Sequence, residues 1–246
     1  MNKKISAALL AGALLTAASG HAATQIDAKT TNLSTRFSPD QAMDVALGIL
    51  GVGNREKGAY EKESEYQARI KGMLAVPIMK DRALGDQFVF RALPDWTQFK
   101  YNADKEEWTY SVRINGYEPA NGIPVDRRAA KTGEYSITDQ VYAQNYGKVV
   151  EHTKTIFLQI PTLKSASAVS GTFKAKPEVA RRMEGWMAVY VIGRLRPPFF
   201  QNYDGYAGRG ENVVDHQWRL PFAVEEIIAV NRNTGEILAR KYTLSK

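Results

Sequence analysis

The sequence predicts an α+β fold in a single domain, with a largely antiparallel sheet and two helices near the N-terminus. Three observations lead to this prediction. Apolar residues recur at helical spacing between residues 38 and 74, whereas beyond about residue 87 they alternate with polar residues, which is the period of a half-buried strand. Short turn-prone segments separate neighbouring strands, and this favours antiparallel pairing over parallel crossovers. The domain is expected to cover residues 38–246.

The N-terminus has the features of a cleavable secretory signal peptide. Two lysines give it a positive start, residues 5–18 form an apolar run, and small residues follow. Gly20 and Ala22 provide the small side chains that a signal peptidase requires, so cleavage is expected after Ala22, or one residue later. The run is too short and too rich in alanine to span a bilayer, which takes about 20 apolar residues. The mature protein is therefore expected in the periplasm or outside the cell, without a transmembrane segment.

Residues 23–37 carry no apolar pattern and are expected to form a flexible leader. A first helix is predicted to start at Ser38-Pro39-Asp40, where a capping serine, a proline and an acid suit a helix N-terminus. It is expected to end near residue 50. A second helix is predicted over residues 60–74, because three glutamates lie in its first turns and two cations in its later turns.

Strands are predicted through the rest of the chain, over residues 87–93, 108–114, 134–143, 148–160 and 186–195 and in a C-terminal hairpin of 224–230 and 237–242. Residues 108–114 alternate most clearly, so one face of that strand is expected to meet water. Residues 186–195 are apolar on both faces, which indicates a central strand covered on both sides. Residues 118–133 contain two prolines and are predicted to be a long loop, and residues 177–183 to form one or two helical turns.

Several classes of chemistry are excluded by composition. The chain has no cysteine, and this excludes disulfides, a thiol nucleophile, a cysteine-ligated metal and lipid attachment at a cysteine. Beyond the signal peptide only two histidines remain, His152 and His216, and no Gly-x-Ser-x-Gly motif occurs, so neither a serine hydrolase nor a structural zinc site is expected. Phosphate-binding glycine motifs are absent as well. No metal and no cofactor is therefore expected.

The formal net charge of +7 at pH 7 is a modest excess. The chain contains no dense run of lysine and arginine interleaved with aromatic residues, which is the pattern that follows a phosphate backbone. Nucleic-acid binding is therefore not expected.

The segment 194–210 is the most distinctive part of the sequence. It follows the strand predicted to be most buried, and it is rich in aromatic residues, arginine, proline and glycine. Large aromatic rings and planar guanidinium groups are favoured at binding surfaces. The candidate binding residues are Arg194, Arg196, Phe199, Phe200, Tyr203, Tyr206 and Arg209. The alternative is that Phe199, Phe200 and Tyr203 fold back and cover the core.

The sequence contains no motif that determines an activity. The leading hypothesis is a non-catalytic binding or accessory protein of the cell envelope, which contacts an envelope protein or a glycan through residues 194–210. The alternative is an envelope glycan hydrolase, because two carboxylates from distant strands are enough for that reaction. Glu225 and Glu226 are the most visible acidic pair, but neighbouring strand residues face opposite sides. A third class, an assembly or inhibitor protein, would expose a large apolar patch.

Overall fold

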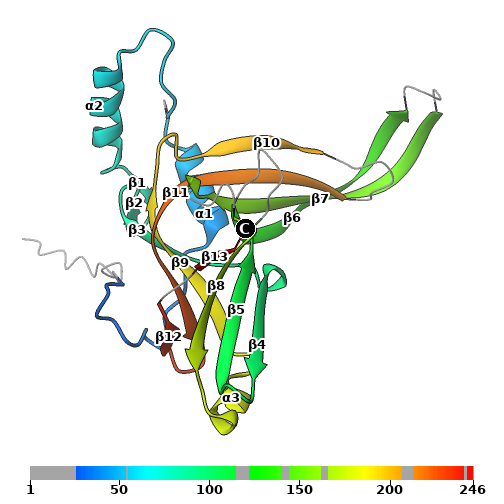
Figure 1. Cartoon of the computed structure of the whole chain (residues 1–246). Coiled ribbons are helices and arrows are strands. Elements are labelled where there is room, and N and C mark those ends of the chain that lie inside the picture. The colour runs from blue at the N-terminus through cyan, green and yellow to red at the C-terminus, as the bar shows by residue number, and fades with distance from the viewer. Residues whose placement is uncertain are drawn as a thin grey trace, which may run out of the picture.

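The computed structural model describes residues 26–53, 55–114, 122–139, 144–161, 166–206, 213–240 and 243–245. The predicted signal peptide and its cleavage site after Ala22 lie outside these ranges. Within them the fold mixes α and β structure, with mainly strand (Figure 1). The helices are α1 (Ala42–Leu50), α2 (Glu63–Met73) and α3 (Pro177–Met183), with a 3-10 turn at Pro94–Trp96. None of the described helices is both long enough and apolar enough to cross a membrane.

The described strands form a seven-stranded, a four-stranded and a two-stranded sheet. Their bounds are β1 (Pro77–Met79), β2 (Arg82–Ala83), β3 (Gln87–Arg91), β4 (Thr97–Asn102), β5 (Glu107–Arg113), β6 (Ile123–Asp139), β7 (Gln144–Gln159), β8 (Ala168–Lys174), β9 (Met187–Leu195), β10 (Gln201–Tyr206), β11 (Val213–Asn231), β12 (Ile237–Ala239) and β13 (Thr243–Ser245). The seven-stranded sheet follows the order β3-β9-β11-β7-β6, with β10 and β12 also paired to β11.

Strand β11 joins the two halves of the largest sheet. Its first half, Val213 to Pro221, pairs with β7 in parallel and with β10 in antiparallel orientation. Its second half, from Phe222 to Asn231, pairs with β9, and β12 pairs near its end. Every other described ladder is antiparallel. The sheets are therefore largely antiparallel, and the β7–β11 pair is the exception.

The four-stranded sheet, in the order β13-β8-β5-β4, has one buried face and one face exposed to solvent. Along β5, Trp108, Tyr110 and Val112 are buried, whereas Thr109 and Arg113 between and beyond them are exposed. The alternation in the sequence therefore predicts this strand and its buried face correctly. The buried residues join the main core together with α1, α3 and one face of β9 and β11.

Strand β9 is central and covered on both faces, as its sequence predicts. Val189 and Val191 face the main core, whereas Ala188, Tyr190 and Ile192 belong to a second apolar cluster. That cluster lies on the opposite face of β3, β9 and β11, because alternate side chains of a strand point to opposite sides.

The N-terminal segment covers the second cluster, contrary to the expectation of a flexible leader. Ile26 and Leu33 are buried, and the Phe37 ring lies 5.9 Å from that of Tyr190. The backbone of the segment is also bonded, since the N–H of Leu33 donates to the carbonyl of Gly235 at 2.8 Å. Residues 26–37 are therefore part of the folded unit.

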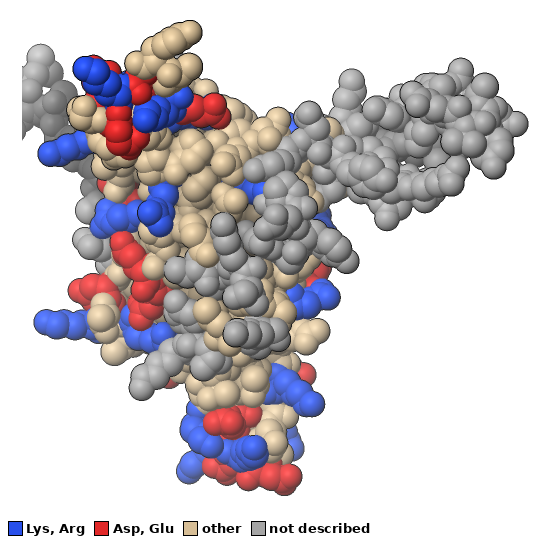
Figure 2. All heavy atoms as spheres, turned by 45° about the horizontal axis from the view of Figure 1, so that its top comes forward, with Lys and Arg blue, Asp and Glu red and all other residues tan. Residues whose placement is uncertain are grey.

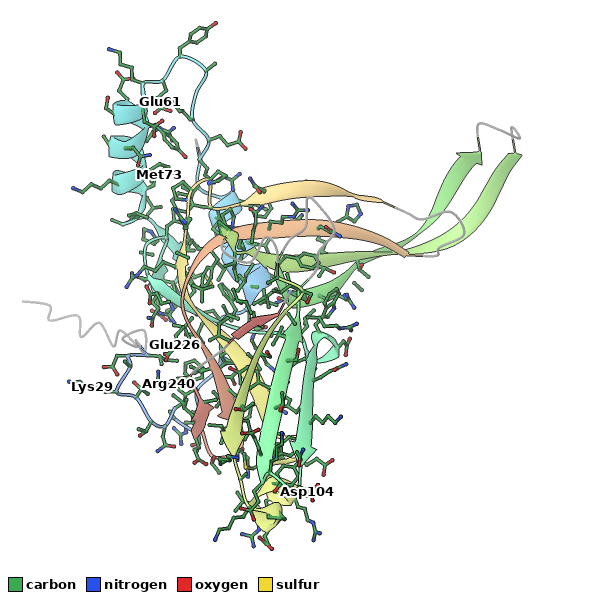
Figure 3. The ribbon with its side chains drawn as sticks, viewed as in Figure 1. Lys29, Glu61, Met73, Asp104, Glu226 and Arg240 are labelled. Atoms are coloured by element: carbon green, nitrogen blue, oxygen red, sulfur yellow. The ribbon has the colours of Figure 1, made fainter. Side chains whose placement is uncertain are left out.

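Arg240 bonds both to this segment and to β11. Figure 3 shows Arg240 next to Glu226, with Lys29 of the segment on the same side of the fold. Its guanidinium donates from Nη1 to a carboxylate oxygen of Glu226 and from Nη2 to the carbonyl of Thr30. Because Arg240 bonds both the carboxylate of Glu226 and the backbone of the N-terminal segment, it holds this segment in place against the sheet.

Helix α1 begins later than predicted, at Ala42, and no side chain next to it in sequence caps it. Its cap comes from β6, where Oδ2 of Asp126 accepts a hydrogen bond from the N–H of Met43 at 3.1 Å. Asp40, which was expected to support the helix start, instead fastens the chain to β3. Its Oδ2 accepts from the N–H of Val89 at 2.8 Å, and its own N–H donates to the carbonyl of Val89 at 2.8 Å.

Asp40 makes the stability dependent on pH. Burial raises the pKa of its carboxyl above 3.8, against the smaller opposing effects of the Val89 N–H and of Arg82, 3.2 Å away. A raised pKa in the folded state means that folding takes up a proton, so the contribution of Asp40 to stability is greatest below pH 3.8 and is lost as the pH rises through the raised value. We expect the stability of the wild type relative to Asp40→Asn to increase as the pH falls through this window.

Urea unfolding of both proteins at several pH values measures this effect. Asp44→Asn is the matched control, because Asp44 lies one turn further along the same segment and its side chain is 55% exposed. A difference between the wild type and Asp40→Asn that stays constant with pH would contradict the assignment.

Candidate functional site

The segment 194–210 is mostly strand, so the prediction of one continuous loop is wrong. Strand β9 extends to Leu195, and β10 starts at Gln201 and runs beside β11. Between them the chain makes a tight turn, in which the N–H of Phe199 donates to the carbonyl of Arg196 at 2.6 Å and Phe199 has a φ of 67°. The peptide bond between Pro197 and Pro198 is cis.

Two of the seven candidate residues lie in the core. Phe199 is 0% exposed and Phe200 is 7% exposed. The Phe200 ring meets that of Trp218 edge-on at 5.2 Å between centroids, and the guanidinium of Arg55 lies 5.5 Å from its centre. Neither phenylalanine presents its ring to a partner. For these two residues the alternative interpretation, in which the aromatic rings cover the core, agrees with the structure.

The remaining candidates are spread along this region. Arg194 and Arg196 are exposed, and Arg194 donates from Nε to Glu225 at 2.9 Å and from Nη1 to the carbonyl of Gly85 at 2.7 Å. Tyr203 and Tyr206 lie in β10, but their side chains, and the whole of Arg209, are outside the described part of the chain. The described residues therefore do not form one aromatic and arginine surface here.

The acidic pair Glu225 and Glu226 lies at an irregularity in the ladder between β9 and β11. Glu225 pairs with Arg194, and its other oxygen accepts from Nε2 of Gln87 at 2.6 Å. Glu226 pairs instead with Arg240 of the C-terminal hairpin. The two carboxylates are thus bonded to separate partners on different elements. This arrangement gives the hydrolase alternative no support, and no group of three metal-ligating side chains occurs among the described residues.

The feature that stands out in the fold is a two-stranded ribbon formed by the far ends of β6 and β7. The described pairing of β7 with β11 covers Glu151 to Gln159. On the other side of Glu151, residues 133–139 of β6 pair with residues 144–150 of β7, and these two segments have no other described strand partner. At about 3.4 Å per residue this ribbon is on the order of 20 Å long. Figure 1 shows it extending away from the rest of the fold. We call residues 133–139 and 144–150 the β6–β7 ribbon.

Both edges of the ribbon lack a neighbouring strand among the described residues. β6 is the last strand of its sheet, and the described part of β11 starts at Val213, which pairs with Glu151 next to the ribbon. Neither half of the ribbon contains a proline, so every residue carries a backbone N–H. An isolated two-stranded hairpin is at best marginally stable in water, and its edges present the N–H and C=O groups with which a further strand pairs.

Sequence reasoning located only part of this ribbon. The strands at 134–143 and 148–160 were predicted, but 118–133 was assigned to a loop, whereas β6 already begins at Ile123. Pro124 and the run Asp126-Arg127-Arg128 led to that assignment. In the structure Pro124 lies in an edge strand next to an irregularity of the ladder, where a proline is tolerated. The combined length of the two neighbouring strands β6 and β7 was the signal in the sequence that could have identified the ribbon.

The charges on the described surface are mixed in sign. In Figure 2, lysine and arginine side chains are interspersed with aspartate and glutamate over α2 and over the end of the fold that carries α3. On the face drawn there, no large area of one sign marks a site for a polyanion or a polycation.

Comparison of this chain with protein families, with curated proteins and with solved structures gives no match.

Proposed function

We propose that this chain is an exported, non-catalytic binding protein of the cell envelope, and that the β6–β7 ribbon holds its partner. The N-terminal signal pattern supports export, to the periplasm of a bacterium with two membranes. The separate pairing of Glu225 and Glu226 with arginines supports a binding role rather than glycan hydrolysis.

The observation that carries the proposal is the ribbon itself. Its ladder continues past the described start of β11, so among the described residues the backbone groups along both of its edges have no strand partner. A regular row of N–H and C=O groups matches an extended polypeptide, which adds as a further strand. A sugar polymer has no equivalent row of donors and acceptors. Of the two partners expected from the sequence, the ribbon therefore favours a protein that contributes a strand.

The test is a variant in which residues 133–150 are replaced by Asn-Gly. This turn suits a two-residue hairpin, and it joins Thr132 to Glu151, which are paired in the ladder. We expect the variant to keep the melting temperature of the wild type within a few degrees, because the β7–β11 ladder is untouched. Affinity capture from the native envelope fraction should lose at least nine-tenths of the partner.

Photo-crosslinking gives the matched control. A benzoylphenylalanine in place of Ser136, within the ribbon, should crosslink to the same partner, whereas one in place of Thr109, exposed on β5, should not. Retention of the captured partner by the shortened variant, or equal crosslinking from the two positions, would refute the proposal.

A further inference from the structure

Two arginines on one face of the largest sheet have no ion pair with a described carboxylate. Arg91 is the last residue of β3 and pairs with Tyr190 of β9, and Arg232 directly follows β11. Trp186, just before β9, lies against Arg232, whose guanidinium is 6.0 Å from the centre of its ring. Arg91, Trp186, Tyr190 and Arg232 form the Arg91–Arg232 cluster, which lies on the face of β3, β9 and β11 that carries the second apolar cluster. In Figure 1, α3 is at the lower end of the fold, next to the start of β9.

Arg91 is half-buried, and one of its donors has no partner in the described part of the chain. Its Nε is buried and has no hydrogen-bond partner within the described residues. Burial lowers the pKa of Arg91, and the positive charge of Arg232 lowers it further. Among the described groups only Arg232 and Tyr190 act on its charge. A guanidinium in this position is ordinarily paired, because a buried charge without a counter-ion is costly.

Tyr190 and Arg232 add donors beside Arg91. Tyr190 is 4% exposed, and its hydroxyl experiences both guanidinium charges, which oppose the effect of burial on its pKa. Arg232 uses Nη2 to donate to the carbonyl of Gly185 at 3.0 Å, so its orientation is fixed while its other donors remain. Neither arginine forms an ion pair with a described carboxylate.

We propose that the Arg91–Arg232 cluster binds a phosphate group, with the two guanidinium groups as its main ligands and the Tyr190 hydroxyl as a further donor. An oxyanion with several acceptor oxygens satisfies both arginines at once and removes their mutual repulsion. Trp186 is 48% exposed and provides an apolar wall for whatever the phosphate is attached to. The site uses no residue of the β6–β7 ribbon, so it is independent of the function proposed above.

Inorganic phosphate and vesicles that contain phosphatidylglycerol are the two probes. Calorimetric titration of the mature wild-type protein with phosphate, at constant ionic strength set with chloride, tests for a free anion. Co-sedimentation with the vesicles, with and without competing phosphate, tests for a lipid headgroup. Saturable binding to either probe is expected, with loss of at least tenfold in affinity for Arg91→Gln and Arg232→Gln.

Arg113→Gln is the matched control. Arg113 also lies over a tryptophan, 5.2 Å from the centre of Trp96, and also donates from Nη2 to a backbone carbonyl, that of Asp95 at 3.1 Å. It lies on another sheet, so Arg113→Gln should bind as the wild type does.

Binding only to phosphate in solution identifies a free anion as the ligand, and binding only to vesicles identifies a lipid headgroup.

The folding of each variant is checked by circular dichroism and by its melting temperature without ligand. Arg91→Gln should melt at or above the temperature of the wild type, since it removes one of two repelling cations. Absence of binding to both probes by the wild type overturns the proposal, as does an equal loss of binding in Arg113→Gln. A lower melting temperature of Arg91→Gln without ligand would also contradict it, because Arg91 would then be a structural residue with its own partner.

Discussion

Phe199→Ala is expected to destabilise the protein by about 3–5 kcal/mol, the cost of removing a phenylalanine from a packed core. The ring is 0% exposed, so its loss leaves a cavity and removes apolar surface that folding had taken from water. The positive φ of 67° at this position is unfavourable for any residue with a Cβ, phenylalanine and alanine alike. The expected loss therefore comes from the ring. Urea denaturation monitored by circular dichroism measures the change.

Two further variants separate the ring from the backbone and from the surface. Phe199→Gly removes the same ring but suits the positive φ, so we expect it to be more stable than Phe199→Ala by about 1 kcal/mol. Arg196→Ala, in the same turn but exposed, should change stability by less than about 0.5 kcal/mol. If Phe199→Ala were as stable as the wild type and yet lost the captured partner, the ring would belong to a binding surface after all.

Some features of the fold are set within a single segment and can be predicted from its sequence. The alternation of Trp108, Tyr110 and Val112 predicts a strand with one buried face, because the period of two is a property of a single strand. Residues 186–195 predict a central strand for the same reason, since both faces are apolar, and the structure has this strand at Met187–Leu195. Each of these predictions needs only the side chains of one segment.

Other parts of the fold depend on residues far apart in the chain. The cap of α1 comes from Asp126, which is 83 residues from Met43. Ser38 and Asp40 therefore indicate a helix start that is too early. Leu33 is buried against a sheet whose strands lie more than 50 residues away, and its own neighbours give no pattern that shows this. The parallel pairing of β7 with β11 is likewise set by the whole fold.

The candidate sites, like the fold, depend partly on single segments and partly on residues that are far apart in the chain. Residues 194–210 stand out by composition, but composition does not distinguish aromatic rings that fill a core from rings that face a partner. The ribbon is defined by where the pairing of β11 ends, and this is a property of the assembled sheet. Arg91, Tyr190 and Arg232 are unremarkable residues in their own segments, and only the register of β3 and β9 and the end of β11 bring them together.

Gly193→Ala and Gly72→Ala are expected to have opposite effects, although each adds one methyl group. A Cβ on Gly193 would lie 2.0 Å from the carbonyl oxygen of Ala223 and 2.8 Å from a ring carbon of Phe222. The carbonyl belongs to the backbone of β11 and cannot move without breaking the ladder, so we expect a loss of about 3 kcal/mol or more. A Cβ on Gly72 meets nothing within 4 Å, and in α2 it should add about 1 kcal/mol.

The reason for the close approach at Gly193 lies in the path of β11. Gly193 pairs with Val224, directly before the irregularity that separates Val224 from Glu226 in the register. An extra residue in one strand bends and twists it locally, and here it does so near the start of the half of β11 that pairs with β9. Thermal and urea unfolding of both variants measure the two effects. Equal stability of Gly193→Ala and the wild type would mean that β9 and β11 are further apart at this point, and that the bend of β11 does not depend on a residue without a side chain.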